Sequence, residues 1–136
     1  MDKLFLDTNV VVDFLCGREG FYLPAAKLVT KGYNKEVELW CSTFTLSTAS
    51  YILEKNHVKY SQIINMLTEF VKICQLSPID QEVVESALSS DFTDFEDALQ
   101  YFSAKKCGVE IIISRNKEDF AHSGLPVCLP TEYLGK

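Results

Sequence analysis

Short runs of apolar residues alternate along the chain with longer segments in which apolar positions recur every three or four residues. The short runs predict strands at residues 4–6, 37–41 and 110–114, with shorter strands near 73–76 and 127–129. The longer segments predict helices at residues 10–15, 24–30, 43–55, 60–74, 81–88 and 94–106. Alternating strands and helices are typical of stacked β-α units. The pattern therefore predicts a single α/β sandwich built on a mostly parallel sheet of four or five strands.

Individual residues refine the expected helices. Gly32 is expected to close the helix at residues 24–30, and Asp80 is placed to cap the helix that runs through Leu88. The segment 60–74 carries one apolar stripe at helical spacing, made of Ile63, Ile64, Leu67, Phe70 and Val71. This stripe is expected to face the core.

Composition limits the class of protein. The chain has 136 residues, the usual length of one domain, and can bury roughly two thirds of the surface of its unfolded state. Its five cysteines lie far apart without a C-x-x-C pair, so they are expected to be buried thiols in a reducing cytosol. No apolar run is long enough for a membrane span, and the first residues lack a signal-like pattern. A cytoplasmic protein without membrane contact is expected.

The charge balance is acidic. Nineteen Asp and Glu against 13 Lys and Arg give a formal net charge of -6. This balance argues against a protein that coats nucleic acid by bulk electrostatics. It does not exclude a nuclease, because carboxylates can hold cations that then face phosphate.

Carboxylates come after two of the predicted strands and at the start of a predicted helix. Asp7 ends the first apolar run, and an unpaired buried carboxylate is costly to desolvate, so a partner is expected opposite it. Asp94 and Asp97 are three residues apart on one face of a helix's first turn, and Asn116 and Asp119 follow the strand at 110–114. In an open parallel sheet, ligands bind beyond the carboxyl ends of the strands. These segments are therefore expected to converge on one pocket.

Each acidic segment also has a purely structural explanation. Asp7 can be a helix N-cap, Asp94 and Asp97 can complement a helix dipole, and Asp119 can cap a short turn. Their conjunction favours a functional cluster, in which a divalent cation offsets the mutual repulsion of the carboxylates. Magnesium prefers oxygen ligands and keeps several waters. The chemistry that this arrangement suggests is metal-assisted hydrolysis of a phosphodiester.

Competing catalytic motifs are missing from the sequence. The chain has no G-x-S-x-G segment, its six glycines are scattered rather than forming a phosphate-binding loop, and His57 and His122 lie in predicted helix-end and loop regions. A haloacid-type phosphatase would need a second Asp at the position of Asn9.

Taken together, these segments resemble the PIN-domain family of metal-dependent nucleases, whose small members include the toxin ribonucleases of toxin/antitoxin pairs. The resemblance rests on FLDTNVVVDFL, CSTFTLSTASYIL, DFEDALQYFSAKKCGVEIIISRN and KEDF, and covers nearly the whole chain. It implies a single PIN-like domain over residues 1–136, with a three-layer α/β/α sandwich. It also implies a ribonuclease that uses Mg²⁺ or Mn²⁺, with RNA as substrate, an antitoxin as partner and a possible homodimer.

The resemblance also assigns roles to residues. Asp7, Asp97 and Asp119 would be the catalytic metal ligands, with Asp94 as a further catalytic acid. Residues expected to support the site are Thr8, Asn9, Thr48 and Asn116. Independently of the resemblance, Arg115, which adjoins the acidic loop after the strand at 110–114, or Lys117 is expected to meet substrate phosphates.

One position departs from the family pattern. Many members place Glu six residues after the serine that matches Ser42, where this chain has Thr48, whose hydroxyl is a poor metal ligand. Glu54 lies on about the opposite helix face and cannot replace it, whereas Asp94 shares a face with Asp97. The alternative to an enzyme is therefore a PIN-fold module that binds RNA or a protein without cleaving.

Residues outside the cluster carry simpler expectations. Asp13 is expected to be a surface residue or a salt-bridge partner. Tyr22, Leu23, Tyr51 and Tyr60 are candidates for an exposed contact with a partner, but burial is the simpler expectation for each.

Overall fold

The computed structural model describes residues 1–136 and contains one five-stranded sheet. Its strands are β1 (Lys3–Leu6), β2 (Glu38–Ser42), β3 (Cys74–Ser77), β4 (Ile111–Ile113) and β5 (Val127–Cys128). The strand order is β3-β2-β1-β4-β5 and every pairing is parallel. The predicted parallel sheet is therefore confirmed, and the carboxyl ends of all five strands lie at one edge.

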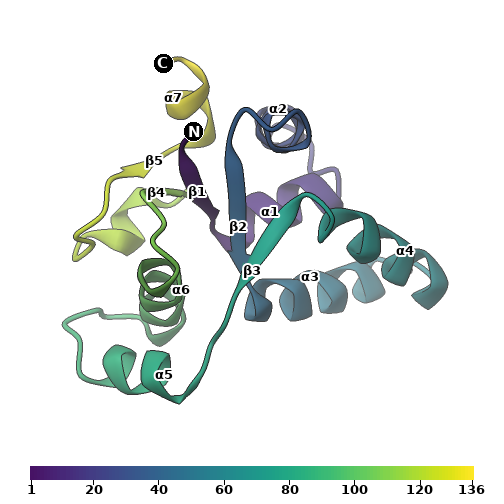
Figure 1. The fold of residues 1–136 in the computed structure, drawn as a ribbon. Helices are drawn as coiled ribbons and strands as arrows, with labels where there is room; N and C mark the ends of the chain where they lie inside the picture. Colours follow the sequence, from purple (N-terminus) through teal and green to yellow (C-terminus); the bar gives the residue numbers. More distant parts are fainter.

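Helices cover both faces of the sheet (Figure 1). One layer holds α1 (Thr8–Leu15), α2 (Tyr22–Tyr33), α3 (Thr43–Lys55) and α4 (Tyr60–Phe70), and the other holds α5 (Gln81–Leu88) and α6 (Phe95–Lys106). A 3₁₀ helix, η1 (Lys117–Phe120), follows β4, and the short helix α7 (Pro130–Leu134) ends the chain and was not predicted. The fold is the expected three-layer α/β/α sandwich. None of the helices is both long and apolar enough to cross a bilayer.

Side chains of the central strand alternate between two cores. Leu4 and Leu6 of β1 pack with apolar residues of α1 to α4, whereas Phe5 between them packs with Tyr101 of α6 and Ile112 of β4. Successive residues of a strand point to opposite faces, so a fully apolar run is required where both faces are covered. This requirement explains the apolar run that the sequence places immediately before Asp7.

Gly32 has a different role from the predicted one. It lies inside the last turn of α2 rather than after the helix. A Cβ atom at this position would lie 2.3 Å from Cδ1 of Leu39 in β2, so only glycine allows α2 to approach the sheet this closely. The prediction that Gly32 ends the helix was wrong, because close packing rather than a left-handed cap requires the glycine.

The predicted burial of α4 was only partly correct. Ile63 and Phe70 are buried and Leu67 is half-buried, but Ile64 and Val71 are exposed, and the helix ends at Phe70. The expectation of burial was also wrong for Tyr22, Leu23, Tyr51 and Tyr60, all of which are exposed. The chain has no further layer to cover these side chains, and Tyr22 is covered only in part, where its ring stacks on Phe14.

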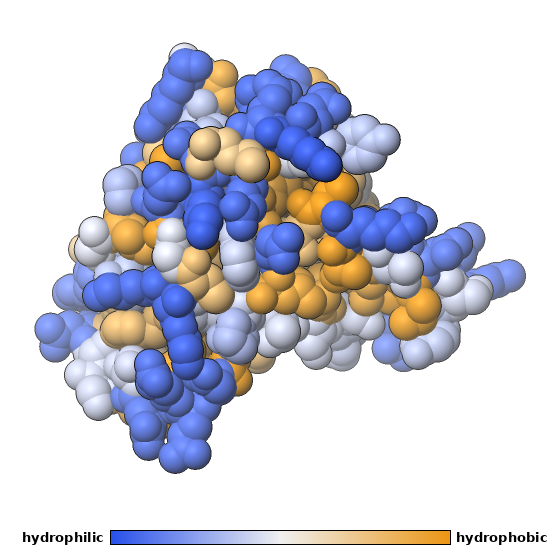
Figure 2. Space-filling view, viewed as in Figure 1, coloured by the Kyte–Doolittle hydropathy of each residue, from blue (hydrophilic) through white to orange (hydrophobic).

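Apolar side chains also line a groove between α1, α2 and α4. Its walls are Phe14, Leu15, Tyr22, Met66, Phe70 and Ile73, with Glu69 at the margin. Figure 2 shows apolar surface gathered between α2 and α4 on this face of the molecule. The five cysteines contribute no covalent cross-link, since all are free thiols.

Candidate functional site

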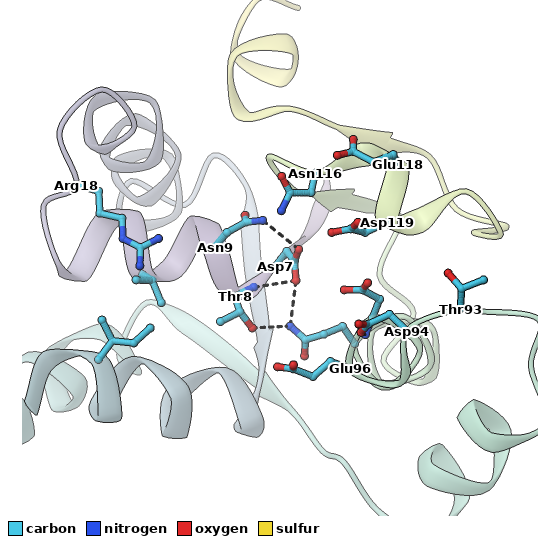
Figure 3. A pocket seen from close by; sticks show the side chains of 14 residues that line it. Asp7, Thr8, Asn9, Arg18, Thr93, Asp94, Glu96, Asn116, Glu118 and Asp119 are labelled. Atoms are coloured by element: carbon cyan, nitrogen blue, oxygen red, sulfur yellow. Dashed lines mark hydrogen bonds between the residues drawn. The ribbon is translucent and has the colours of Figure 1, made fainter. Parts of the chain in front are cut away.

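An acidic cleft of about 430 Å³ opens at the carboxyl edge of the sheet (Figure 3). Its lining is polar apart from two aliphatic side chains and comprises Asp7, Thr8, Asn9, Val12, Arg18, Ile52, Thr93, Asp94, Glu96, Asp97, Gln100, Asn116, Glu118 and Asp119. The three acidic segments predicted to converge do meet here: the end of β1, the start of α6 and η1. Parallel topology brings them together because all three follow or face strand ends at one edge.

Asp7 is the most buried acid of the cleft, with 6% of its surface exposed. Its Oδ1 accepts hydrogen bonds from the backbone N–H of Thr8 at 2.9 Å and from Nε2 of Gln100 at 3.3 Å. Its Oδ2 accepts from Oγ of Ser114 at 2.8 Å and from Nδ2 of Asn9 at 3.4 Å. Burial raises the pKa of Asp7, and these donors oppose that rise by favouring the charged form.

Asp7 combines a structural role with a position in the cleft. Asp7 is the N-cap of α1, as its extended backbone and its bond to the N–H of Thr8 show. The same carboxylate also faces the cleft beside other acids. The partners expected opposite Asp7 therefore include neutral hydrogen-bond donors. These donors orient the carboxylate but do not neutralise its charge.

Gln100 joins three elements behind Asp7. Its side-chain oxygen accepts a short hydrogen bond from the hydroxyl of Ser42, which fixes the orientation of the amide. Its Nε2 is then directed at Thr8 Oγ1 at 3.0 Å, Thr45 Oγ1 at 3.1 Å and Asp7 Oδ1. Gln100 is 3% exposed, and the network leaves no buried side-chain polar atom without a partner. Gln100 was not predicted from the sequence, although its position three residues after Asp97 on the buried face of a helix was a usable signal.

The acids on α6 combine capping with mutual repulsion. Asp94 is the N-cap of the helix, and its Oδ1 accepts from the N–H of Asp97 at 3.0 Å. Desolvation, followed by repulsion from Asp94, Asp119 and Asp7, raises the pKa of Asp97 to about 7. The pKa of Asp119 is also raised, mainly by desolvation, although a hydrogen bond from Asn116 opposes the rise.

The raised pKa of Asp97 predicts a pH-dependent stability without added metal. The folded state holds the Asp97 proton to about pH 7, whereas the unfolded chain releases it near 3.8, the ordinary pKa of an aspartate. Stability should therefore fall as pH rises from about 4 to about 7 and stay low above that range. Because Asp97→Asn removes the charge, we expect the variant to melt roughly 2–5 °C above the wild type at pH 8 and at a similar temperature near pH 4.

Thermal melting in EDTA across this range checks the expectation, with Asp91→Asn as the control for an exposed acid outside the cleft. Melting curves for Asp97→Asn and wild type that differ by the same amount at every pH would contradict it.

Three predicted site residues lie outside the cleft lining. Arg115 donates to Asp13 from Nε at 2.6 Å and from a terminal nitrogen at 3.2 Å, and Lys117 pairs with Glu132 at 3.1 Å. The cations expected to meet substrate are thus already engaged with carboxylates of this chain. Thr48 is half-buried on α3, between Thr45 and Ile52 on the cleft-facing side of the helix, but does not line the cleft itself.

Asp13 turned out to be buried, with 1% of its surface exposed. Asp13 forms a salt bridge with Arg115, which confirms one of the two expectations for this residue. The alternative expectation, a surface residue, was wrong. Helix α1 directs the Asp13 side chain away from the cleft and toward Arg115, which follows Ser114 after the end of β4. The pair therefore ties α1 to the strand edge that carries the site.

The donor set matches a hard divalent cation in chemistry. All acids of the cleft offer oxygen ligands, and a cation would relieve the repulsion that adds to desolvation in raising the pKa of Asp97. No three His, Cys, Asp or Glu side chains stand close enough in the structure to hold a metal ion between them. Magnesium in proteins is commonly held by one or two carboxylates with waters in the remaining positions, so the residues present fit such an ion.

Position 48 allows a direct test of whether the cleft lacks a carboxylate on α3. A glutamate at this position would add a carboxylate on the face of α3 between Thr45 and Ile52, of which Ile52 lines the cleft. We expect Thr48→Glu to tighten Mn²⁺ binding by roughly tenfold, because the charge of the ligand set largely decides affinity for hard cations.

Isothermal titration with Mn²⁺ measures this change. Thr48→Gln is the matched control, since it adds nearly the same volume without the charge. Equal affinity in the two variants would show that position 48 does not reach the cation.

The sheet order and the acidic cleft at its carboxyl edge define a PIN-like α/β/α protein. The family model described as PIN domain matches residues 3–118. The chain therefore belongs to the PIN-domain family.

Individual relatives agree with this assignment. The chain is 28% identical over 125 residues to Ribonuclease VapC1 of Aquifex aeolicus, covering 88% of this chain and 85% of that protein. Among solved structures, a toxin-antitoxin complex from Klebsiella pneumoniae has a chain with a TM-score of 0.68 and 22% identity, covering 93% of this chain and 97% of that one. VapBC-1 from nontypeable Haemophilus influenzae gives a TM-score of 0.69 at 14% identity, covering 95% and 98%. At these identities the solved structures establish the fold alone.

Proposed function

We propose that this chain is a divalent-metal-dependent ribonuclease that hydrolyses RNA phosphodiester bonds, formed by one PIN-like domain over residues 1–136. The observation that carries the proposal is the convergence of Asp7, Asp94, Asp97 and Asp119 on one cleft at the carboxyl edge of the sheet. The similarity to a protein named Ribonuclease VapC1 supports RNA as the substrate class. Mg²⁺ or Mn²⁺ is the cation that the oxygen donors favour.

The residues of the cleft divide the work between them. Asp7, Asp97 and Asp119 would hold the cation in part through bound water, since no three of the acids stand close enough to bind it directly together. The donors around Asp7 favour the ionised form of its carboxylate and hold it in one orientation. Gln100, locked by Ser42, keeps Asp7 and Thr8 at fixed positions relative to α3 and α6. Asn116 supports Asp119 in the same way. A bound divalent cation would lower the pKa of water and offset the charge of the phosphate in the transition state.

Asp97 is the acid whose protonation state changes most easily. In the metal-free protein its raised pKa, about 7, leaves it partly protonated at neutral pH. It therefore gives up its proton readily when positive charge enters the cleft, and binding should release protons and strengthen with pH.

Cleavage of a mixed RNA pool tests the proposal. The protein is incubated with the pool in Mg²⁺, in Mn²⁺ and in EDTA, and products are resolved by denaturing electrophoresis. Cleavage that needs the cation supports the enzyme. Equal background in all three conditions contradicts it and favours the alternative, a PIN-fold module that binds RNA or a protein without cleavage.

Thr48 is the observation that favours this alternative. It replaces the glutamate expected on α3 and does not line the cleft, so the acid set is weaker than the family pattern implies. Asp94 stands in the cleft beside Asp97 and is the residue that we propose compensates for the loss.

We further propose that the protein is the toxin of a toxin/antitoxin pair. The solved structures with this fold include a toxin-antitoxin complex, which supports an antitoxin as partner. A basic side chain of such a partner would be attracted to the acids of the cleft. Exposed aromatic residues on the outer faces of α3 and α4, Tyr51 and Tyr60, are consistent with a homodimer.

A further inference from the structure

The acidic cleft contains one positively charged side chain. Six of its lining residues are acids, namely Asp7, Asp94, Glu96, Asp97, Glu118 and Asp119, and the single base among them is Arg18. An RNA strand carries one negative charge per nucleotide, so a strand entering this cleft meets repulsion wherever no cation compensates. Arg18 is therefore the one place in the lining where a side chain can attract an RNA phosphate, because the rest of the cleft is not basic.

The positive charge of Arg18 is not neutralised by neighbouring carboxylates. It contacts Asp13 at 3.7 Å, but the carboxylate of Asp13 is already held by two hydrogen bonds from Arg115, at 2.6 and 3.2 Å. Two guanidinium groups thus share one carboxylate, which leaves one net positive charge. Arg115 is covered by the ring of Phe21, 3.9 Å from its guanidinium carbon, and lies outside the cleft. The surplus charge is accordingly presented to the cleft by Arg18, whose side chain is 42% exposed.

The position of Arg18 complements that of the acids. It follows the end of α1, and in Figure 3 it lies on one side of Asp7 while Asp94 and Asp119 lie on the other. The two aliphatic residues of the lining, Val12 and Ile52, belong to the helices α1 and α3 that flank this part of the cleft. Arg18 therefore sits at a less acidic part of the same cleft, where the backbone of a strand can pass without meeting further carboxylates.

We propose that Arg18 binds a phosphate of single-stranded RNA next to the phosphate that is cleaved, and so positions the strand across the acids. This inference rests on the proposed ribonuclease function and adds to it the residue that recognises the substrate backbone. A guanidinium can donate two parallel hydrogen bonds to one phosphate, which gives both affinity and orientation. The contact carries no base specificity, since phosphate is common to every nucleotide.

The test compares three substitutions of full-length protein: Arg18→Gln, Arg18→Lys and Lys27→Gln. Lys27 is an exposed base on α2 outside the cleft, so its variant removes the same charge from the molecule at another place. Binding of a fluorescein-labelled pool of single-stranded RNA is measured by anisotropy in Ca²⁺, between about 50 and 200 mM salt. Melting temperatures of all variants are measured alongside, because Arg18 also contacts Asp13.

We expect Arg18→Gln to weaken RNA binding about tenfold and to reduce the salt slope of log affinity by about 0.7, the value for one phosphate contact on a single strand. Arg18→Lys should retain the slope with a smaller loss of affinity, and Lys27→Gln should behave as wild type. In cleavage assays the loss should fall on KM rather than kcat, because a remote phosphate contact is made in both the bound and the transition state.

Three outcomes would overturn the inference: unchanged affinity of Arg18→Gln, a loss matched by Lys27→Gln, or an unchanged salt slope. If Arg18→Gln fails to fold, Arg18→Lys replaces it with affinity as the criterion, because lysine keeps the charge and therefore the salt slope. An affinity of Arg18→Lys equal to that of the wild type would then overturn the inference. Absence of cleavage by the wild type overturns the proposed function instead, while the anisotropy measurement still decides whether Arg18 contacts RNA.

Discussion

Replacing Asp97 with asparagine is expected to reduce metal-dependent cleavage of RNA by at least about 100-fold, since even residues that only support a metal ligand cost 10–100-fold when lost. The substitution keeps the shape of the side chain and removes its charge. Desolvation, together with repulsion from Asp94, Asp119 and Asp7, raises the pKa of Asp97 to about 7, so the charge of its carboxylate at neutral pH depends on a bound cation. Cleavage rates in Mn²⁺ with a labelled RNA pool measure the effect.

The control for Asp97→Asn is Asp91→Asn, which changes an exposed acid outside the cleft and should leave the rate unchanged. The metal-free Asp97→Asn variant should fold at least as well as the wild type, because it relieves repulsion. Lost activity therefore cannot be ascribed to unfolding. An Asp97→Asn variant that cleaves at the rate of the wild type would remove Asp97 from the mechanism.

The second large effect is on stability. Replacing Asp13 with alanine should lower the free energy of unfolding by about 3 kcal/mol, because removal of one partner of a buried ion pair leaves the other charge uncompensated. Asp13 is 1% exposed, and Arg115 keeps a quarter of its side chain in solvent, which places the expected loss at the low end of the range for buried pairs. Denaturation in urea measures the change.

A surface ion pair provides the comparison. Glu69 pairs with Lys72 at 3.2 Å one turn further along, and both side chains are largely exposed. Glu69→Ala should change the free energy of unfolding by less than about 1 kcal/mol. Similar losses for Asp13→Ala and Glu69→Ala would mean that the Asp13–Arg115 pair does not tie α1 to the end of β4 as the structure indicates.

Local patterns predicted the fold well where one residue's environment followed from its neighbours in sequence. The apolar run before Asp7 predicted β1, and Asp80 caps α5 through the N–H of Val83 as expected. Gly32 was misjudged because the side chain that excludes a larger residue is Leu39, which is brought near only by tertiary packing. Exposure of Tyr51 and Ile64 was missed for a similar reason, since a helical stripe does not reveal how much of it another layer covers.

The candidate site shows the same division. Acids after strand ends predicted the cleft because parallel topology places those ends together. Gln100 and Arg18 were not predicted. The role of Gln100 depends on its contact with Ser42, which is distant in sequence. The role of Arg18 depends on Asp13, which Arg18 shares with Arg115. Arg115 was assigned to substrate because it follows β4, and only the geometry shows that Asp13 already occupies it.

The central claim is that the carboxylates of the cleft hold a divalent cation, and crystals soaked in Mn²⁺ test it most directly through anomalous scattering. The account predicts a peak about 2.0–2.2 Å from a carboxylate oxygen of Asp7, with Asp97 as a further ligand or joined through water. A well-ordered cleft with only water among Asp7, Asp97 and Asp119 at high Mn²⁺ concentration would contradict it.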